Sequence, residues 1–209
     1  MSSETLHIME NMDREALDTQ LAMQCAPVLA GIKVSNLLNI PRIHVESAEK
    51  RLAESPLSVS LLYTAGSRAT LLLYRREALE TYLGTTEVRK LLAAWGYTVF
   101  ALEAVLERFA ERYRSCRSRG NHYPHEIGLL LGYPVEDVRG FVENKGKNFL
   151  CSGYWKVYAN RREAEALFAL YEDTREQAVR MLAEKRDIRE LWGGCRRPED
   201  RGICKTDCK

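Results

Sequence analysis

The chain has 209 residues, of which 45% are hydrophobic and 29% are charged, and its formal net charge is +2. This length can bury one substantial core, and the composition is that of an ordinary soluble globular protein. Lys and Arg are nearly balanced by Asp and Glu, which argues against a nucleic-acid-binding protein with its usual basic excess.

The compartment follows from what the sequence lacks. The first 20 residues are polar and partly acidic, without the apolar segment of a signal peptide. No apolar run approaches the roughly 18 residues that a membrane span needs. We therefore expect a cytoplasmic protein with no membrane partner. Its six cysteines are then mostly reduced, and they are candidates for packing, metal ligation or reactive thiol chemistry before disulfides.

The N-terminal part is expected to be helical and then interrupted. Residues 13–24 show helical spacing of apolar side chains after a capping residue. Pro27 and Gly31 break this periodicity, so we expect the backbone to bend there. Residues 35–40 follow without an assigned secondary structure, and residues 46–54 predict a short charged helix.

The clearest β pattern is a hairpin over residues 57–74, in which two apolar runs flank a loop that contains Gly66. Residues 153–158 alternate aromatic or apolar side chains with small or charged ones, which predicts another strand. We expect this strand to join the hairpin as the third, antiparallel strand of one sheet.

Helical spacing and glycine stop signals predict further helices over residues 75–83, 85–95, 102–117, 124–131, 135–145 and 161–191. The predicted fold class is α+β, with a small antiparallel sheet (hairpin 57–74 plus strand 153–158) covered by helices. We expect one domain over residues 1–192, followed by a flexible, basic, cysteine-containing tail over residues 193–209.

The first candidate site pairs Cys25 with His125. A reactive thiol needs a base or a positive charge nearby to lower its pKa. His125 is a candidate base, Glu126 or Asn144 a candidate for orienting it, and Lys33 a candidate for holding an anion. The alternative is that Cys25 is a small buried core residue and that His125 is a surface or capping group.

The second candidate is a metal site in the tail, formed by the thiols of Cys195, Cys204 and Cys208. Zinc, copper and iron–sulfur clusters are all bound by cysteine thiolates. The spacing fits no standard motif, and a fourth ligand would have to come from Cys151 or a histidine. The alternative is a polar tail that binds no metal.

The third candidate is a helix-turn-helix over residues 125–142, with a glycine in the turn. Its second helix carries Glu136, Asp137 and Glu143, whereas phosphate binding needs a net positive face. We therefore favour a packed helical hairpin over a DNA-binding motif.

The fourth candidate is the loop over residues 143–149 together with Lys156. Lys145, Lys147 and the backbone amides of this loop are suited to hold a phosphate or a carboxylate, with Asn144 beside them. The indole of Trp155 is suited to stack on a flat ligand. No phosphate-binding or dinucleotide-binding motif is present. The alternative is a solvated loop that links a helix to a strand.

The sequence resembles a bacterial family of unknown function, found in clostridia and related anaerobes, from about residue 23 to residue 170. The resemblance is carried by Cys25-Ala-Pro, Leu29-Ala-Gly-Ile-Lys33, Pro124-His-Glu-Ile-Gly128, Gly132-Tyr-Pro134, Glu143-Asn-Lys-Gly146 and Cys151-Ser-Gly-Tyr-Trp-Lys156. It implies no established activity and no known cofactor. It does imply a setting near flavodoxin-like genes, and hence a redox partner as one hypothesis.

These observations lead to one main hypothesis and two alternatives. The main hypothesis is a small-ligand or reactive-thiol site at Cys25 and His125, with a small anionic molecule as the ligand. The first alternative is a non-catalytic accessory protein that docks on a flavodoxin-like redox partner. The second alternative is DNA binding through residues 125–142.

Overall fold

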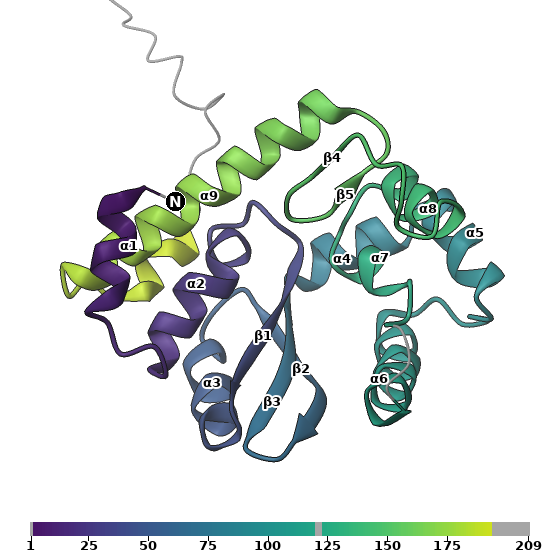
Figure 1. Ribbon diagram of the computed structural model, residues 1–209. Helices are drawn as coiled ribbons and strands as arrows, with labels where there is room; N and C mark the ends of the chain where they lie inside the picture. Colours follow the sequence, from purple (N-terminus) through teal and green to yellow (C-terminus); the bar gives the residue numbers. More distant parts are fainter. Residues whose placement is uncertain (1, 120–122, 194–209) are drawn as a thin grey trace, which may run out of the picture.

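The computed structural model describes residues 2–119 and 123–193 of the chain (Figure 1). The strands are β1 (Ser35–Pro41), β2 (Ser58–Ala65), β3 (Arg68–Tyr74), β4 (Cys151–Ser152) and β5 (Lys156–Val157). The helices are α1 (Ser3–Glu10), α2 (Leu17–Leu29), α3 (Val45–Leu52), α4 (Arg76–Leu83), α5 (Thr86–Ala94), α6 (Leu102–Arg119), α7 (Ile127–Leu130), α8 (Val135–Glu143) and α9 (Arg161–Ala183), with short 3-10 helices η1 (Arg42–His44) and η2 (Ile188–Gly193).

The main sheet is antiparallel with the strand order β1-β3-β2, so β3 lies in the centre. The predicted hairpin at 57–74 is present as β2 and β3. Its third strand, however, is β1, which pairs Leu37 with Leu72 of β3. Residues 153–158 instead contribute to a separate two-stranded sheet, β4-β5. The α+β class is confirmed, whereas the predicted third strand of the main sheet is wrong.

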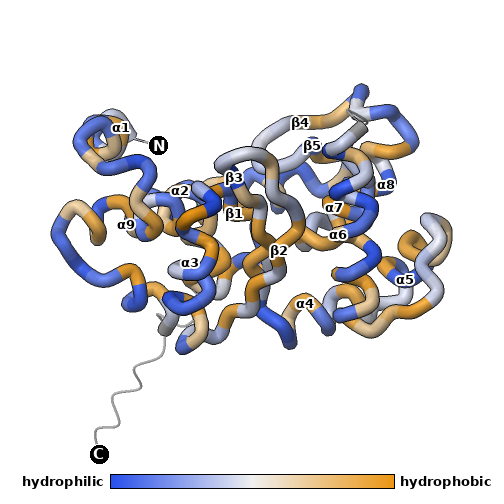
Figure 2. Tube along the Cα trace, turned by 90° about the horizontal axis from the view of Figure 1, so that it is seen from below, coloured by the Kyte–Doolittle hydropathy of each residue, from blue (hydrophilic) through white to orange (hydrophobic). Residues whose placement is uncertain are grey.

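The two faces of β3 bury different cores, because successive side chains of a strand point in opposite directions. Leu71 and Leu73 pack with α2, α3, η2 and part of α9. Leu72 and Tyr74 pack with α4, α5, α6 and α7. Both views of the chain show this separation, with α1, α2, α3 and α9 on one side of the sheet and α4 to α8 on the other (Figures 1 and 2).

Helix α2 continues through Pro27, so the predicted bend comes later than expected. Pro27 lies in the last turn of the helix, and Arg75 caps the terminal carbonyls of Val28 and Leu29. The Arg75 guanidinium donates to them, with distances of 2.9 Å from Nε to the Val28 oxygen and 2.7 Å from Nη2 to the Leu29 oxygen. Gly31, with a φ of 76°, then turns the chain toward β1.

A third, smaller core lies where the β4-β5 hairpin packs on α8 and α9. Its buried members are Trp155, Val157, Ala164 and Tyr171. This core holds the two-stranded sheet beside the α7–α8 pair. Among the helices in residues 2–119 and 123–193, none is long and apolar enough to cross a membrane.

A substitution at Gly140 of α8 tests the close contact between α8 and the end of β5. A Cβ atom at this position would lie 2.5 Å from the Cβ of Tyr158. Ala normally stabilises a helix relative to Gly by about 1 kcal/mol. Here we expect Gly140→Ala to lower the free energy of unfolding by about 1–3 kcal/mol, because the two elements must separate. Urea denaturation measures the change, and an unchanged or raised stability would contradict the close packing.

Candidate functional site

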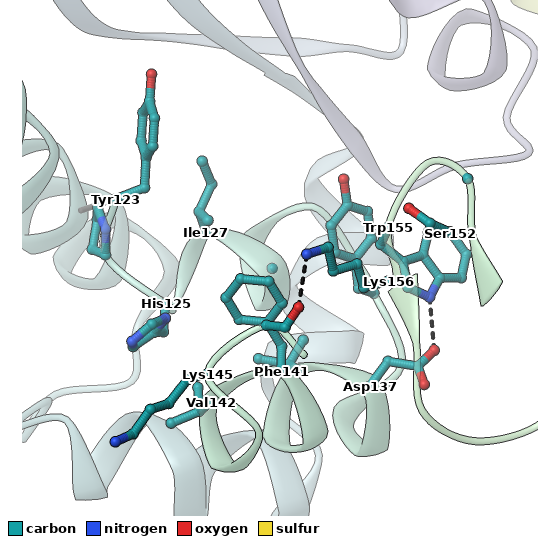
Figure 3. Close-up of a pocket in the computed structure, with 16 residues that line it drawn as sticks. Tyr123, His125, Ile127, Asp137, Phe141, Val142, Lys145, Ser152, Trp155 and Lys156 are labelled. Atoms are coloured by element: carbon teal, nitrogen blue, oxygen red, sulfur yellow. Dashed lines mark hydrogen bonds between the residues drawn. The ribbon is translucent and has the colours of Figure 1, made fainter. Parts of the chain in front are cut away.

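A concave site lies between the α7–α8 pair and the β4-β5 hairpin, and it has a volume of about 810 Å³. This is the size of pocket that binds small molecules in proteins. The lining residues are Tyr123, Pro124, His125, Ile127, Gly128, Tyr133, Asp137, Val138, Phe141, Val142, Lys145, Gly146, Ser152, Gly153, Trp155 and Lys156 (Figure 3).

Glycines allow the two helices at the pocket to approach closely. Gly132, in the turn between α7 and α8, has a φ of 71°, and a side chain there would overlap Val34. A Cβ at Gly128 would lie 2.9 Å from Cγ2 of Val138. Gly128 in α7 and Gly132 in the turn are thus both closely packed, and α7 is the single turn Ile127–Leu130, shorter than the helix predicted over 124–131.

Asp137 fixes one wall of the pocket. This carboxylate is buried, and its Oδ2 accepts a hydrogen bond from Nε1 of Trp155 at 2.7 Å. Its Oδ1 accepts from the backbone amides of Tyr158 at 2.7 Å and Ala159 at 2.9 Å. Three donors stabilise the charge of a buried carboxylate. Asp137 is thereby a structural residue that attaches α8 to β5 and sets the orientation of the indole.

Aromatic rings continue this wall behind the indole. Tyr133 stacks on Trp155, with ring centroids 4.9 Å apart and an interplanar angle of 27°. Phe168 of α9 meets the indole of Trp155 edge-on, with ring centroids 4.5 Å apart. The Tyr133 hydroxyl donates to the Tyr154 carbonyl at 3.2 Å. Stacking and hydrogen bonding together hold Trp155 and Tyr133 in one arrangement.

Basic side chains stand around Phe141, which projects between them. His125 and Lys145 lie on one side of Phe141 and Lys156 on the other (Figure 3). The His125 and Phe141 ring centroids are 6.1 Å apart. Nζ of Lys156 donates to the Gly146 carbonyl at 2.7 Å and lies 4.9 Å from the Phe149 ring centroid. The pocket thus combines aromatic surface with two ammonium groups and an imidazole.

The structure brings together four of the residues in the predicted sites, His125, Lys145, Trp155 and Lys156, in this pocket. Asn144 instead closes the end of α8, where its Nδ2 donates to the Gly140 carbonyl at 2.9 Å. Lys147 is exposed and does not line the pocket. These two residues of the 143–149 loop therefore lie outside the site.

Three amides of that loop are already engaged, contrary to the prediction that they hold an anion. The amide of Lys145 donates to the Val142 carbonyl, that of Gly146 to Phe141, and that of Lys147 to Asn144. The first two bonds form the usual closure of a helix, with its left-handed residue, Lys145, at a φ of 51°. At these positions an anion would depend on side chains such as that of Lys145.

Cys25 lies in a different part of the fold from His125. It is fully buried in α2, within the core that includes Leu38 and Leu71, and its Sγ is 3.7 Å from the Leu37 carbonyl oxygen. Burial raises the pKa of the Cys25 thiol to about 12. His125 contacts Trp95 and Phe141 instead. The structure does not bring the predicted thiol and its base together.

Glu126 is also turned away from a catalytic role with His125. Its side chain is buried, and Oε1 accepts a hydrogen bond from the Tyr97 hydroxyl at 3.1 Å and pairs with Nε of Arg112. These contacts attach the start of α7 to α6. The residue before the pocket helix is thereby fixed, while the neighbouring His125 stays exposed to the pocket.

Lys33 is the one buried lysine in the described part of the chain. Nζ donates to Oδ1 of Asn36 and lies 5.4 Å from the ring centroid of Tyr133 and 6.0 Å from that of Tyr171. Burial lowers the pKa of the Lys33 ammonium to about 8, and the nearby Cys25 thiol opposes this shift. No carboxylate within residues 2–119 and 123–193 forms a salt bridge with it.

Two other predicted sites have different outcomes. In α8 the acidic Asp137 is buried and the exposed Arg139 lies 3.5 Å from Oε2 of Glu87, and DNA binding through residues 125–142 stays a prediction. The metal site at Cys195, Cys204 and Cys208 lies outside the described residues. Within the described ranges, no group of three or more His, Cys, Asp or Glu side chains is arranged for a metal.

Phe141 and Asp137 are two pocket residues that the sequence did not predict. Asp137 has the pattern of an ordinary acidic residue in the first turn of a helix. Phe141 has the pattern of an inward-facing apolar residue, yet it is 38% exposed at the pocket. Neither residue carries a motif, so only the packing of α8 against β5 could identify them.

The pH dependence of stability tests the burial of Lys33. Its folded pKa, about 8, lies below the ordinary value of 10.5, so the unfolded state binds more protons between these two pH values. The free energy of unfolding of the native chain should therefore rise relative to Lys33→Met by about 1 kcal/mol per pH unit from pH 8 to pH 10. Urea denaturation at a series of pH values measures this difference. A constant difference between the two proteins would show that Lys33 is solvated.

Comparison with known proteins adds a family but no activity. The family model described as "Protein of unknown function (DUF3793)" matches residues 21–192. Neither the curated proteins nor the solved structures give a match to the chain. The bacterial and anaerobic origin that the resemblance implies stays a prediction. The match confirms the expected membership in an uncharacterised family, and the chain belongs to the DUF3793 family of proteins of unknown function.

Proposed function

We propose that the protein binds a small anionic ligand with a flat aromatic part in the pocket between α7–α8 and β4-β5. The observation that carries this proposal is the combination of His125, Lys145 and Lys156 with the rings of Phe141 and Trp155 around one cavity of about 810 Å³. Aromatic rings stack on flat apolar groups, and ammonium groups attract anions.

The charge balance of the pocket supports an anion. Asp137 is the acidic residue in the lining, and its two oxygens already accept three hydrogen bonds. Lys145 and Lys156 have no salt bridge to a carboxylate in the part of the chain that the structure describes. A bound carboxylate, sulfonate or phosphate would supply the missing negative charge.

The backbone at Lys145 is left-handed, with a φ of 51°. This conformation is unfavourable for a residue with a Cβ atom, and glycine is the usual residue at this position of a helix end. Lys185 adopts the same conformation after α9, so the support from Lys145 comes from its place in the pocket lining.

The other hypotheses receive less support. A reactive Cys25 stays a prediction that its burial and raised pKa do not favour. Docking on a redox partner stays an alternative, and one observation fits it: Phe149 and Leu150 are exposed, as is Lys147 close by in the sequence. The cytoplasmic location and the absence of DNA binding also stay predictions.

Fluorescence titration with 1-anilinonaphthalene-8-sulfonate, a flat aromatic anion, tests the proposal. We expect saturable binding of about one probe per chain, which Phe141→Ala and Lys156→Met each weaken about tenfold, as expected for one ring contact or one charge contact. Lys50→Met, an exposed lysine of α3 paired with Glu46, is the matched control and should bind as the native chain does. Absent binding, or equal binding by all four proteins, would refute the proposed site.

Lys145 permits a sharper test, because Lys185 repeats its conformation far from the pocket. Lys185 follows α9 with a φ of 59° and donates to the Leu182 carbonyl. Glycine relieves the left-handed strain at either position, so Lys145→Gly and Lys185→Gly should each raise the free energy of unfolding by about 0.5–1 kcal/mol. Only Lys145→Gly should weaken binding of the sulfonate probe. Equal affinities of the two variants would remove Lys145 from the site.

A further inference from the structure

Lys33 carries a buried positive charge without an acidic partner. Its side chain is 6% exposed, and its polar contact is the amide oxygen of Asn36. The rings of Tyr133 and Tyr171 provide two cation–π contacts. These neutral groups only partly replace the water that a buried ammonium loses. The fold therefore retains a charge that a hydrophobic side chain of similar size would avoid.

Tyr133 connects this charge to the pocket. Its ring contacts the Lys33 ammonium and also forms part of the pocket lining. It stacks on Trp155, which lines the same cavity. Hydrogen bonds hold it at both ends, since its hydroxyl donates to the Tyr154 carbonyl and its own carbonyl accepts from the Tyr82 hydroxyl. The ammonium thus lies directly behind a fixed aromatic wall.

The groups around Lys33 leave its charge uncompensated. They come from three elements: Cys25 of α2, Asn36 of β1 and Tyr171 of α9, together with Tyr133 from the turn before α8. Burial keeps the Cys25 thiol protonated at neutral pH, because its pKa is about 12. Burial likewise raises the pKa of the Tyr133 hydroxyl to about 12. All four groups are therefore neutral when Lys33 is charged.

We infer that Lys33 makes the pocket selective for anions over neutral molecules of the same shape, acting through the Tyr133 wall without touching the ligand. This inference rests on the proposed function and adds a specificity-determining residue to it. An electrostatic interaction is stronger across packed protein than across water, because the protein interior screens charge less. The field of a buried ammonium consequently reaches a ligand beyond one aromatic ring.

Two probes that differ by one charge test the inference. N-phenyl-1-naphthylamine has the ring system of 1-anilinonaphthalene-8-sulfonate but lacks its sulfonate. We expect Lys33→Met to weaken binding of the sulfonate about tenfold, as a Coulomb term across packed protein predicts, and to leave binding of the neutral probe within about twofold. Lys33→Gln, which keeps a donor for Asn36, should give the same result if the Met variant does not fold.

The control variant and the probe pair separate the outcomes. Lys33→Arg keeps the positive charge and should retain the native preference for the sulfonate over the neutral probe. If both probes lose affinity equally, Lys33 only supports the shape of the wall. If both probes bind unchanged, the charge of Lys33 does not act on the ligand. Either result overturns the inference but leaves the proposed pocket in place. If the native chain binds neither probe, the proposed function fails and the inference fails with it.

Discussion

The central strand β3 is the constraint on which the fold depends, because both of its faces are buried. Leu71 and Leu73 belong to the core on the α2 side, and Leu72 and Tyr74 belong to the core on the α4–α7 side. The strand therefore joins the two halves of the chain at the sheet, and neither half can bury its apolar face without it. The pocket is possible because β4-β5 then packs on α8 of one half and α9 of the other.

Where α8 meets β5, Asp137 determines the shape of the pocket. A buried carboxylate is costly unless donors surround it, and here the donors are one indole and two backbone amides of the strand end. Each bond ties α8 to β5, so the charge enforces a fixed distance between the helix and the hairpin. A hydrophobic residue at this position would fill space but would not select one orientation of Trp155.

The sequence predicted the α+β class, the 57–74 hairpin and four residues of the pocket, because these depend on local periodicity, on turn residues and on side-chain chemistry. It missed β1, since residues 35–41 show strand character only when paired with β3. It placed Cys25 beside His125, because sequence alone cannot assign two residues to different cores. Long-range packing determined each of these points, and no local pattern reports it.

The positions of the charged residues are more informative about the pocket than the net charge of the chain. The net charge of +2 suggests near neutrality, and elsewhere many arginines pair with acids, as Arg51 does with Asp18 at 2.7 Å. Around the pocket the balance differs. Lys33 and Lys156 contact an amide or carbonyl oxygen and aromatic rings. Among the described residues, no carboxylate forms a salt bridge with Lys33, Lys145 or Lys156. Two of these lysines carry an evident energetic cost, one through burial and one through its backbone. Stability alone would not favour that arrangement, and a ligand that brings its own negative charge would.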